Sequence, residues 1–224
     1  MQARIDAPAH RSGSGRVVLA TNNAKKLTEL RRVLVTEGIE VLGLSDVAPY
    51  PEPEETGTTF EDNAAIKARA CVAATGVPAL ADDSGLTVEA LGGMPGVRSA
   101  RWAGPGVTDA DNVALVLQQL ADIPAARRRA VFVCVLALAL PDGRTEFVRG
   151  ELAGQLTALP KGENGFGYDP IFVPDGHDRT TAEMTPEEKD AISHRGRAIR
   201  AMVPVLTHLL GRSGAHDHPR AEGP

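Results

Sequence analysis

The chain has little cysteine, few aromatic residues and no long hydrophobic run. Its two cysteines, Cys71 and Cys134, lie in alanine-rich and apolar stretches. We therefore expect buried free thiols in a reducing compartment and no disulfide framework. The longest apolar run, residues 130–140, is too short to span a bilayer, and residues 1–15 lack the apolar core of a signal peptide. A cytoplasmic protein with no membrane partner is predicted.

An excess of positive charge is also missing. The formal net charge is −5 at pH 7, which argues against nucleic acid as a partner. A polyanionic ligand would need local lysines or a bound metal ion instead of a global field. With 42% hydrophobic and 24% charged residues the composition is that of an ordinary globular protein, and 224 residues suffice for one α/β domain or two small ones.

Hydrophobic patterning predicts an α/β protein with a mixed sheet. Strands are expected at residues 16–20, 39–44, 77–81, 86–90, 130–140, 145–148 and 171–173. Helices are expected after residue 23, from 59 to about 75, from 108 and from 185, where Pro204 should kink or end the last one. The domain is placed at residues 16–210, between flexible tails at 1–15 and 211–224.

Asp82-Asp83-Ser84-Gly85 is the first candidate site. It follows an apolar strand, so it would deliver oxygen ligands to a sheet edge, where open α/β folds bind ligands. Neighbouring strand residues point to opposite faces, so one Asp is expected to face the site. Such oxygens suit hard cations such as Mg²⁺. The alternative is a plain turn, because Asp, Ser and Gly are turn formers.

Lysines near two helix starts form a second candidate group. Lys25 and Lys26 follow Thr21-Asn22-Asn23, which offers N-cap side chains, and a phosphate bound there would reconcile these cations with the helix dipole. The alternative is two solvated lysines on a crossover helix. On the helix from residue 59, Asn63 and Lys67 are four residues apart and share a face.

A glycine-rich loop and the helix that follows it form the third group. The loop Gly165-Phe166-Gly167-Tyr168-Asp169-Pro170 combines aromatic rings, which stack on nucleobases, with a carboxylate that accepts ring N–H groups. The alternative is a loop packed for structural reasons. In the helix after Thr185, Lys189 and Ser193 share a face beside His194-Arg195, and all four side chains can donate to phosphate or carbonyl oxygens.

Taken together, these segments resemble the inosine triphosphate pyrophosphatase family, which hydrolyses non-standard purine nucleoside triphosphates. The resemblance covers roughly residues 17–210. It is carried by Ala20-Thr21-Asn22-Asn23-Ala24-Lys25-Lys26, Glu54-Glu55-Thr56-Gly57 with Thr59-Phe60-Glu61-Asp62-Asn63-Ala64, Ala81-Asp82-Asp83-Ser84-Gly85-Leu86, the Gly165–Pro170 loop, and Glu188-Lys189 with Ser193-His194-Arg195-Gly196. Five such segments in order are a specific signal.

The resemblance implies a fold, a site and a cofactor. The fold is an elongated, two-lobed mixed-sheet α/β structure with the active site in the cleft between the lobes, and members resemble homodimers. Asp83 would be the proton acceptor and a Mg²⁺ ligand, with Glu54 as a second metal contact and its neighbour Glu55 left open. The implied substrate-binding residues are Thr21, Asn22, Asn23, Ala24, Lys25, Lys26, Ser84, Phe166, Gly167, Tyr168, Asp169, Lys189, His194 and Arg195.

The expected reaction converts ITP, dITP or XTP to the monophosphate and pyrophosphate. Water oriented by Asp83 attacks the α-phosphorus, while Lys26, Lys189, Arg195 and Mg²⁺ offset the negative charge. One alternative is a septum-associated pyrophosphatase of related fold that acts on modified pyrimidine nucleotides, against which the Ser193–Gly196 stretch argues. The other is a silent nucleotide-binding regulator.

Overall fold

Six strands form one mixed sheet in the computed structural model, which describes residues 15–21, 31, 34 and 38–211. Their spatial order is β2-β1-β3-β4-β5-β6. They are β1 (Gly15–Leu19), β2 (Ile39–Leu42), β3 (Ala79–Val88), β4 (Arg129–Ala139), β5 (Thr145–Leu156) and β6 (Phe172–Pro174). β1 runs parallel to β2 and β3, and the remaining neighbours are antiparallel. The predicted mixed α/β fold is confirmed.

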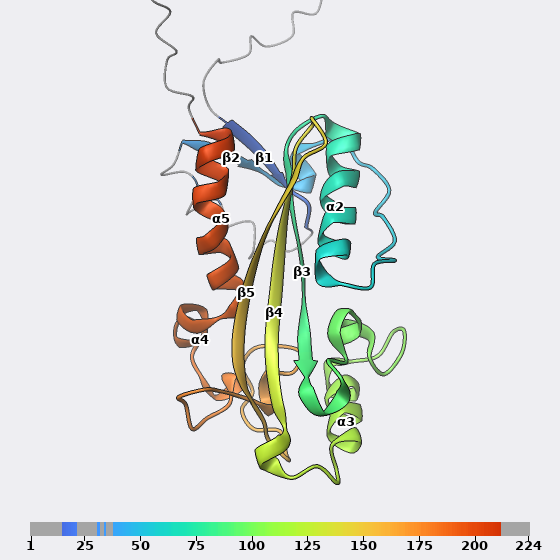
Figure 1. Ribbon diagram of the computed structural model, residues 1–224, viewed down its shortest axis with the longest axis vertical. Coiled ribbons are helices and arrows are strands. Elements are labelled where there is room, and N and C mark those ends of the chain that lie inside the picture. Colours follow the sequence, from blue (N-terminus) through green and yellow to red (C-terminus); the bar gives the residue numbers. More distant parts are fainter. Residues whose placement is uncertain (1–14, 22–30, 32–33, 35–37, 212–224) are drawn as a thin grey trace, which may run out of the picture.

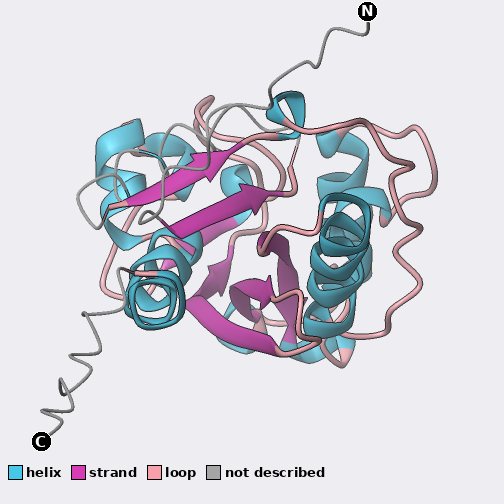
Figure 2. Cartoon of the chain, turned by 90° about the horizontal axis from the view of Figure 1, so that it is seen from above, coloured by secondary structure: helices cyan, strands magenta, loops and turns pink. Residues whose placement is uncertain are grey.

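Helices cover both faces of this sheet. They are α2 (Phe60–Thr75), α3 (Asp109–Gln119), α4 (Pro186–Ile192) and α5 (His194–Leu210). The long strands run the length of the molecule, with α2, α5, β1 and β2 towards one end and α3 towards the other (Figure 1). Seen from above, helices flank the strands on two sides (Figure 2). Both α2 ends follow the sequence prediction, because Thr59 caps its start and the left-handed Gly76 ends it.

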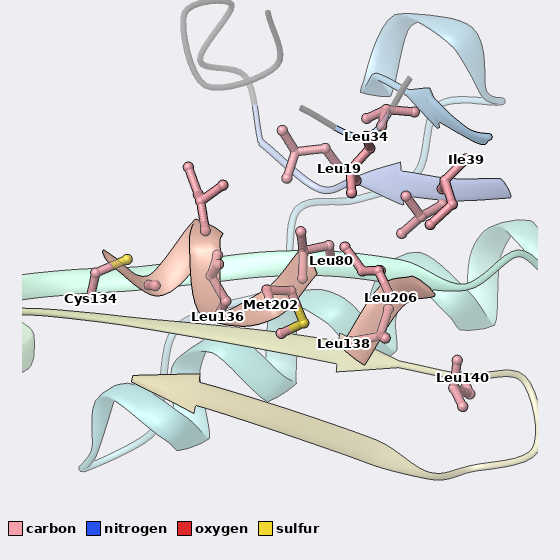
Figure 3. Close-up of a cluster of buried hydrophobic side chains, with 14 residues drawn as sticks. Leu19, Leu34, Ile39, Leu80, Cys134, Leu136, Leu138, Leu140, Met202 and Leu206 are labelled. Atoms are coloured by element: carbon pink, nitrogen blue, oxygen red, sulfur yellow. The ribbon is translucent and has the colours of Figure 1, made fainter. Parts of the chain in front are cut away.

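Alternate side chains of β4 point to opposite faces of the sheet, and the side chains on both faces are apolar. Leu136 and Leu138 belong to a buried cluster with Met202 and Leu206 of α5 (Figure 3). The alternate residues of β4 pack against α2. They are Val133, Val135, Ala137 and Ala139, and they form a cluster with Phe60, Ala64 and Ala68 of the helix. Small residues on α2 let that helix approach the sheet closely. The two faces of the sheet are therefore distinct environments, and neighbouring residues of β3 are divided between them.

The prediction that a strand ends at Asp82 is wrong. Residues 79–88 form one continuous strand that pairs with β4 along its whole length, from Ala79↔Ala139 to Val88↔Ala130. The long apolar β4 supplies the backbone partners that hold Asp82-Asp83-Ser84-Gly85 extended. β1 pairs with β3 only at Ala79 and Leu80. Beyond these two pairs β1 no longer covers the β3 edge, so the carboxylates still lie where a parallel strand ends.

The helix after Thr185 also differs from the prediction. It breaks at Ser193, whose backbone is extended, and Ser193 then caps α5 by accepting the N–H of Gly196. His194 and Arg195 therefore lie in the first turn of a new helix. Pro204 does not end α5, which continues to Leu210 because Met202 and Leu206 are buried against the sheet.

Gly150 sets how closely α5 approaches β5. A Cβ atom at this position would overlap the carbonyl oxygen of His194 and lie 2.5 Å from the backbone nitrogen of Ala198. Gly150→Ala is therefore expected to lower the free energy of unfolding by about 1–3 kcal/mol. Urea unfolding measures this change, with Glu146→Ala at an exposed position of the same strand as control. Equal stability of the two variants would contradict the close approach.

Several predicted features lie outside the described residues. These are the tails at 1–14 and 212–224 and most of the helix predicted after residue 23. Cys71 and Cys134 are described, and both are buried and free, as predicted. None of the helices in the described part of the chain has the length and hydropathy needed to cross a membrane.

Candidate active site

Asp83 lies on the face of β3 that α2 covers, and it is largely buried. Its Oδ2 accepts a hydrogen bond of 3.2 Å from Nδ2 of Asn63, a fully buried residue. The other end of that amide accepts the N–H of Gly57 at 2.8 Å. This second bond fixes the orientation of the amide, so Asn63 presents its N–H₂ group to the carboxylate.

Lys67, one helical turn after Asn63, joins two carboxylates. Its Nζ is 2.8 Å from Oε1 of Glu55 and 3.7 Å from Oδ1 of Asp83. Arg101 reaches Oε2 of Glu55 at 3.5 Å from the other side. The arrangement is a partly buried charge network in which Lys67 is the central cation, and the i, i+4 spacing of Asn63 and Lys67 aims both at Asp83.

Opposing effects set the pKa values in this network. Burial raises the pKa of Asp83 above its ordinary value, and the charge of Lys67 and the Asn63 hydrogen bond offset only part of that rise. Burial works to lower the pKa of Lys67, but the hydrogen bond to Glu55 and the nearby carboxylates outweigh it and raise that pKa. Lys67 is therefore a permanent cation beside an acid that is a better proton acceptor than an ordinary Asp.

Asp82 lies on the opposite face of β3, the face that α5 covers. Its Oδ2 is 3.8 Å from Nε of Arg195 and accepts the hydroxyl of Ser84 at 3.3 Å. The prediction that Asp82 and Asp83 face different sides is confirmed. The site thus extends around one edge of β3, with one carboxylate on each side of the strand.

Phe166 and Lys189 meet beside Arg195. The ring of Phe166 is 59% exposed, and Nζ of Lys189 lies 4.6 Å from its centroid. Cζ of Arg195 lies 5.9 Å from the same ring. Lys189 also donates to the buried carboxylate of Asp169, which accepts the N–H of Phe166 at 2.8 Å. Asp169 therefore holds both the loop and the ammonium group, and an exposed aromatic face lies beside two cations.

The other predicted residues of this region occupy supporting positions. The hydroxyl of Tyr168 donates to the carbonyl oxygen of Ser99, and its ring is buried. Burial raises the pKa of this phenol, so it stays neutral. The imidazole of His194 is buried and stacks on Phe132, with ring centroids 5.0 Å apart. The N–H of Gly167 donates to Asp109 at 2.6 Å. These contacts fix the loop and the start of α5.

Two cavities lie in the region. One of about 670 Å³ is lined by Thr21 at the end of β1, by Glu55, Lys67 and Asp82, and by part of the loop at 44–53. Because Lys67 and Asp82 come from opposite faces of the sheet, this cavity spans the β3 edge. A second cavity of about 430 Å³ lies between α3 and the loop that carries Phe166. The described lining of the first cavity includes no residue of that loop. Asp82, which lines the first cavity, is 3.8 Å from Arg195, and Cζ of Arg195 is 5.9 Å from the ring centroid of Phe166, which lines the second.

Glu55, not Glu54, is the glutamate held against this network. Glu54 is exposed, whereas Glu55 is half-buried and bonded to Lys67. Burial works to raise the pKa of Glu55, but the hydrogen bonds from Lys67 and Arg101 outweigh it and keep the pKa low. Glu55 therefore stays ionised, on the same lysine as Asp83.

The oxygen donors present suit a magnesium ion only in part. No group of three or more His, Cys, Asp or Glu side chains that could hold a metal occurs in the described ranges. Asp83 and Glu55 do converge on one ammonium group, and Mg²⁺ is commonly bound by one or two carboxylates together with substrate phosphates and water. The residues therefore fit an ion that binds together with a polyphosphate.

The structure brings four residues into this network to which the sequence analysis assigned no definite role. Asn63 and Lys67 carry a signal in their shared helix face, and Glu55 is the open alternative to Glu54. Asp82 is the aspartate of the pair to which the resemblance assigns no role. Most of the substrate-binding run expected at residues 21–26 lies outside the described residues. Thr21 is described, and the residues that are not are Asn22, Asn23, Ala24, Lys25 and Lys26.

Comparisons with known proteins agree across nearly the whole domain. The model of the Ham1 family matches residues 17–205. The dITP/XTP pyrophosphatase of Nocardia farcinica is 56% identical over 201 residues, which cover 88% of this chain and 98% of that protein. The dITP/XTP pyrophosphatase of Mycobacterium tuberculosis is 54% identical over 197 residues, which cover 87% and 96%.

Solved structures show the same fold. A HAM1 protein from Coxiella burnetii superposes with a TM-score of 0.81 at 45% identity, covering 86% of this chain and 98% of that one. A nucleoside-triphosphatase / dITP/XTP pyrophosphatase from Mycobacterium abscessus has a TM-score of 0.75 at 56% identity, covering 84% and 99%.

Proposed function

Because the chain belongs to the Ham1 family, we propose that it hydrolyses ITP, dITP and XTP to the monophosphate and pyrophosphate. Relatives more than 50% identical carry the name dITP/XTP pyrophosphatase. The observation that carries the proposal is Asp83, a buried carboxylate of raised pKa held by Asn63 and Lys67. Lys67 and the neighbouring Asp82 line a cavity of about 670 Å³. A cavity of this size is sufficient for a small-molecule substrate.

In this mechanism Asp83 is the general base. Its carboxylate accepts a proton from the water that attacks the α-phosphorus, and the bond to the bridging oxygen of the leaving pyrophosphate breaks. Asn63 holds the carboxylate in place, and Lys67 contributes positive charge where negative charge develops. The raised pKa of Asp83 suits proton transfer better than that of an exposed Asp.

Magnesium is part of the proposal. Asp83 and Glu55 would hold the ion, which when bound supplies positive charge that neutralises the leaving pyrophosphate. Lys67 contacts both carboxylates and favours the ionised form of each.

The base would lie against Phe166, near Lys189 and Arg195. The exposed ring provides a stacking surface, and both cations are donor-only groups. Lys189 and Arg195 can donate hydrogen bonds to the keto oxygen of hypoxanthine or xanthine. The amino group of adenine is itself a donor and cannot accept these bonds. This mismatch explains a preference for hypoxanthine and xanthine over adenine.

Pyrophosphate release across a panel of nucleotides tests the proposal. We expect turnover of dITP, ITP and XTP with Mg²⁺, at least about 100-fold faster than that of dATP, and little turnover with EDTA. Faster release from dTTP or UTP would favour the pyrimidine-directed alternative. Tight dITP binding without any release would favour the silent regulator.

A cytoplasmic location and a homodimer remain predictions, the former supported by the two buried free thiols.

A further inference from the structure

A buried ion pair connects the proposed base site with the catalytic strand. Oδ2 of Asp82 and Nε of Arg195 are 3.8 Å apart, which is longer than a hydrogen bond. Both side chains are mostly buried, with 6% and 20% of their surface exposed. Among the described residues, Nε of Arg195 is a buried side-chain nitrogen without a hydrogen-bond partner. An arginine cannot lose its proton, so this N–H group lacks a partner that a small shift towards Asp82 would supply.

The other side of the guanidinium group faces a different environment. Its Cζ lies 5.9 Å from the centroid of the exposed Phe166 ring, beside which Lys189 also lies. Nε is 3.8 Å from Asp82, and no hydrogen bond among the described residues uses the two terminal nitrogens, so these are available as donors for a ligand. Arg195 thus lies between a buried anion and the proposed stacking surface for the base.

We infer that Asp82 is a positioning residue for base selectivity, which rests on the proposed function. Asp82 holds the Nε edge of Arg195, and this aims the terminal N–H groups at the keto oxygen of the purine. Asp83, the next residue, faces the other side of the same strand and serves the reaction itself. The two adjacent carboxylates therefore have different roles: Asp82 contributes to selection of the base, and Asp83 accepts the proton.

Replacing Asp82 by asparagine should reduce discrimination between bases. We expect the ratio of kcat/KM for dITP to that for dATP to fall by roughly 10-fold or more, mostly through a higher KM for dITP. Pyrophosphate release with both nucleotides measures the ratio. Asp175→Asn is the matched control, because it removes a carboxylate from an exposed arginine pair with Arg129 on β4. Its ratio should equal that of the unaltered protein.

A double-variant cycle separates positioning from a merely structural role. In an Arg195→Ala background, Asp82→Asn should change the dITP/dATP ratio no further, because both changes act through the same group. An unchanged ratio in the single variant, or an undiminished effect without Arg195, overturns the inference.

Binding measurements keep the test independent of turnover. Calorimetric affinities for dITP and dATP in an Asp83→Asn background, with and without Asp82→Asn, give the same ratio even where no pyrophosphate is released. If the unaltered protein fails to hydrolyse dITP, the proposed function is wrong. The change in the binding ratio then still decides whether Asp82 positions Arg195.

Discussion

Replacing Asp83 by asparagine is expected to lower kcat for dITP by about 10²–10⁴-fold, the range for loss of a general base. Asparagine keeps the shape of the side chain and its contact with Asn63 but cannot accept a proton. The affinity for dITP in the absence of Mg²⁺ should change little, because the proposed role of the carboxylate is to accept a proton during the reaction and not to bind the nucleotide. Pyrophosphate release and calorimetric binding measure the two quantities separately.

The stability of this variant provides its control. Burial raises the pKa of Asp83 in the folded state, so its contribution to stability is present at low pH and is lost as pH rises through the raised pKa. Asparagine does not ionise and avoids this loss, so the melting temperature at pH 7 should equal or exceed that of the unaltered protein. Wild-type turnover by a folded Asp83→Asn protein would show that the assigned mechanism is wrong.

Replacing Lys67 by methionine should have the second large effect. Methionine keeps the apolar stem but removes the cation between Glu55 and Asp83, leaving two carboxylates without their shared partner. We expect kcat to fall by roughly 10²–10³-fold, as for loss of a group that stabilises developing negative charge. Initial rates of pyrophosphate release at saturating dITP and Mg²⁺ measure the change.

A pH profile distinguishes this role from general damage to the fold. The charge of Lys67 lowers the pKa of Asp83, so its removal should raise that pKa further. The acidic limb of kcat/KM, where the base must be ionised, should therefore move to higher pH. Lys67→Arg keeps the charge and should leave the limb nearly in place. Arg69→Met, an exposed cation two residues along α2, is the matched control. An unshifted limb in Lys67→Met would contradict the coupling between Lys67 and Asp83.

The architecture explains how so few charged residues could serve a polyphosphate in an acidic protein. β1 stops pairing with β3 at Leu80, and the edge of β3 beyond it carries Asp82 to one face and Asp83 to the other. The cavity at this edge reaches both faces. A nucleotide lying across the edge would meet Lys67 on one side and Arg195 on the other. Local placement of cations therefore substitutes for net positive charge.

Features set by neighbouring residues could be predicted from the sequence. The capping box at Thr59 and the glycine at position 76 marked both ends of α2, because caps depend on a few adjacent residues. The segments at 130–140 and 145–148 are predicted as strands, and they form the antiparallel pair of β4 and β5. The four-residue spacing of Asn63 and Lys67 placed both on one helix face, and both contact Asp83.

Other features depended on partners far away in the chain. Asp82-Asp83-Ser84-Gly85 has the composition of a turn, yet pairing with β4 keeps it extended. Glu54 and Glu55 are equivalent in local sequence, and the positions of Lys67 and Arg101 distinguish them. The break at Ser193 places Arg195 beside Asp82, a residue more than a hundred positions earlier.

By itself, the sequence determined both ends of α2, the strands as apolar segments, the division of Asp82 and Asp83 between two faces, and the family resemblance. Each of these follows from residue type and short-range periodicity, which a linear sequence contains. The tertiary structure decided the length of β3, the choice of Glu55 and the pairing of Asp82 with Arg195. These depend on burial and on charges brought together by folding, and the strength of both is set by distance in space and not by position along the chain.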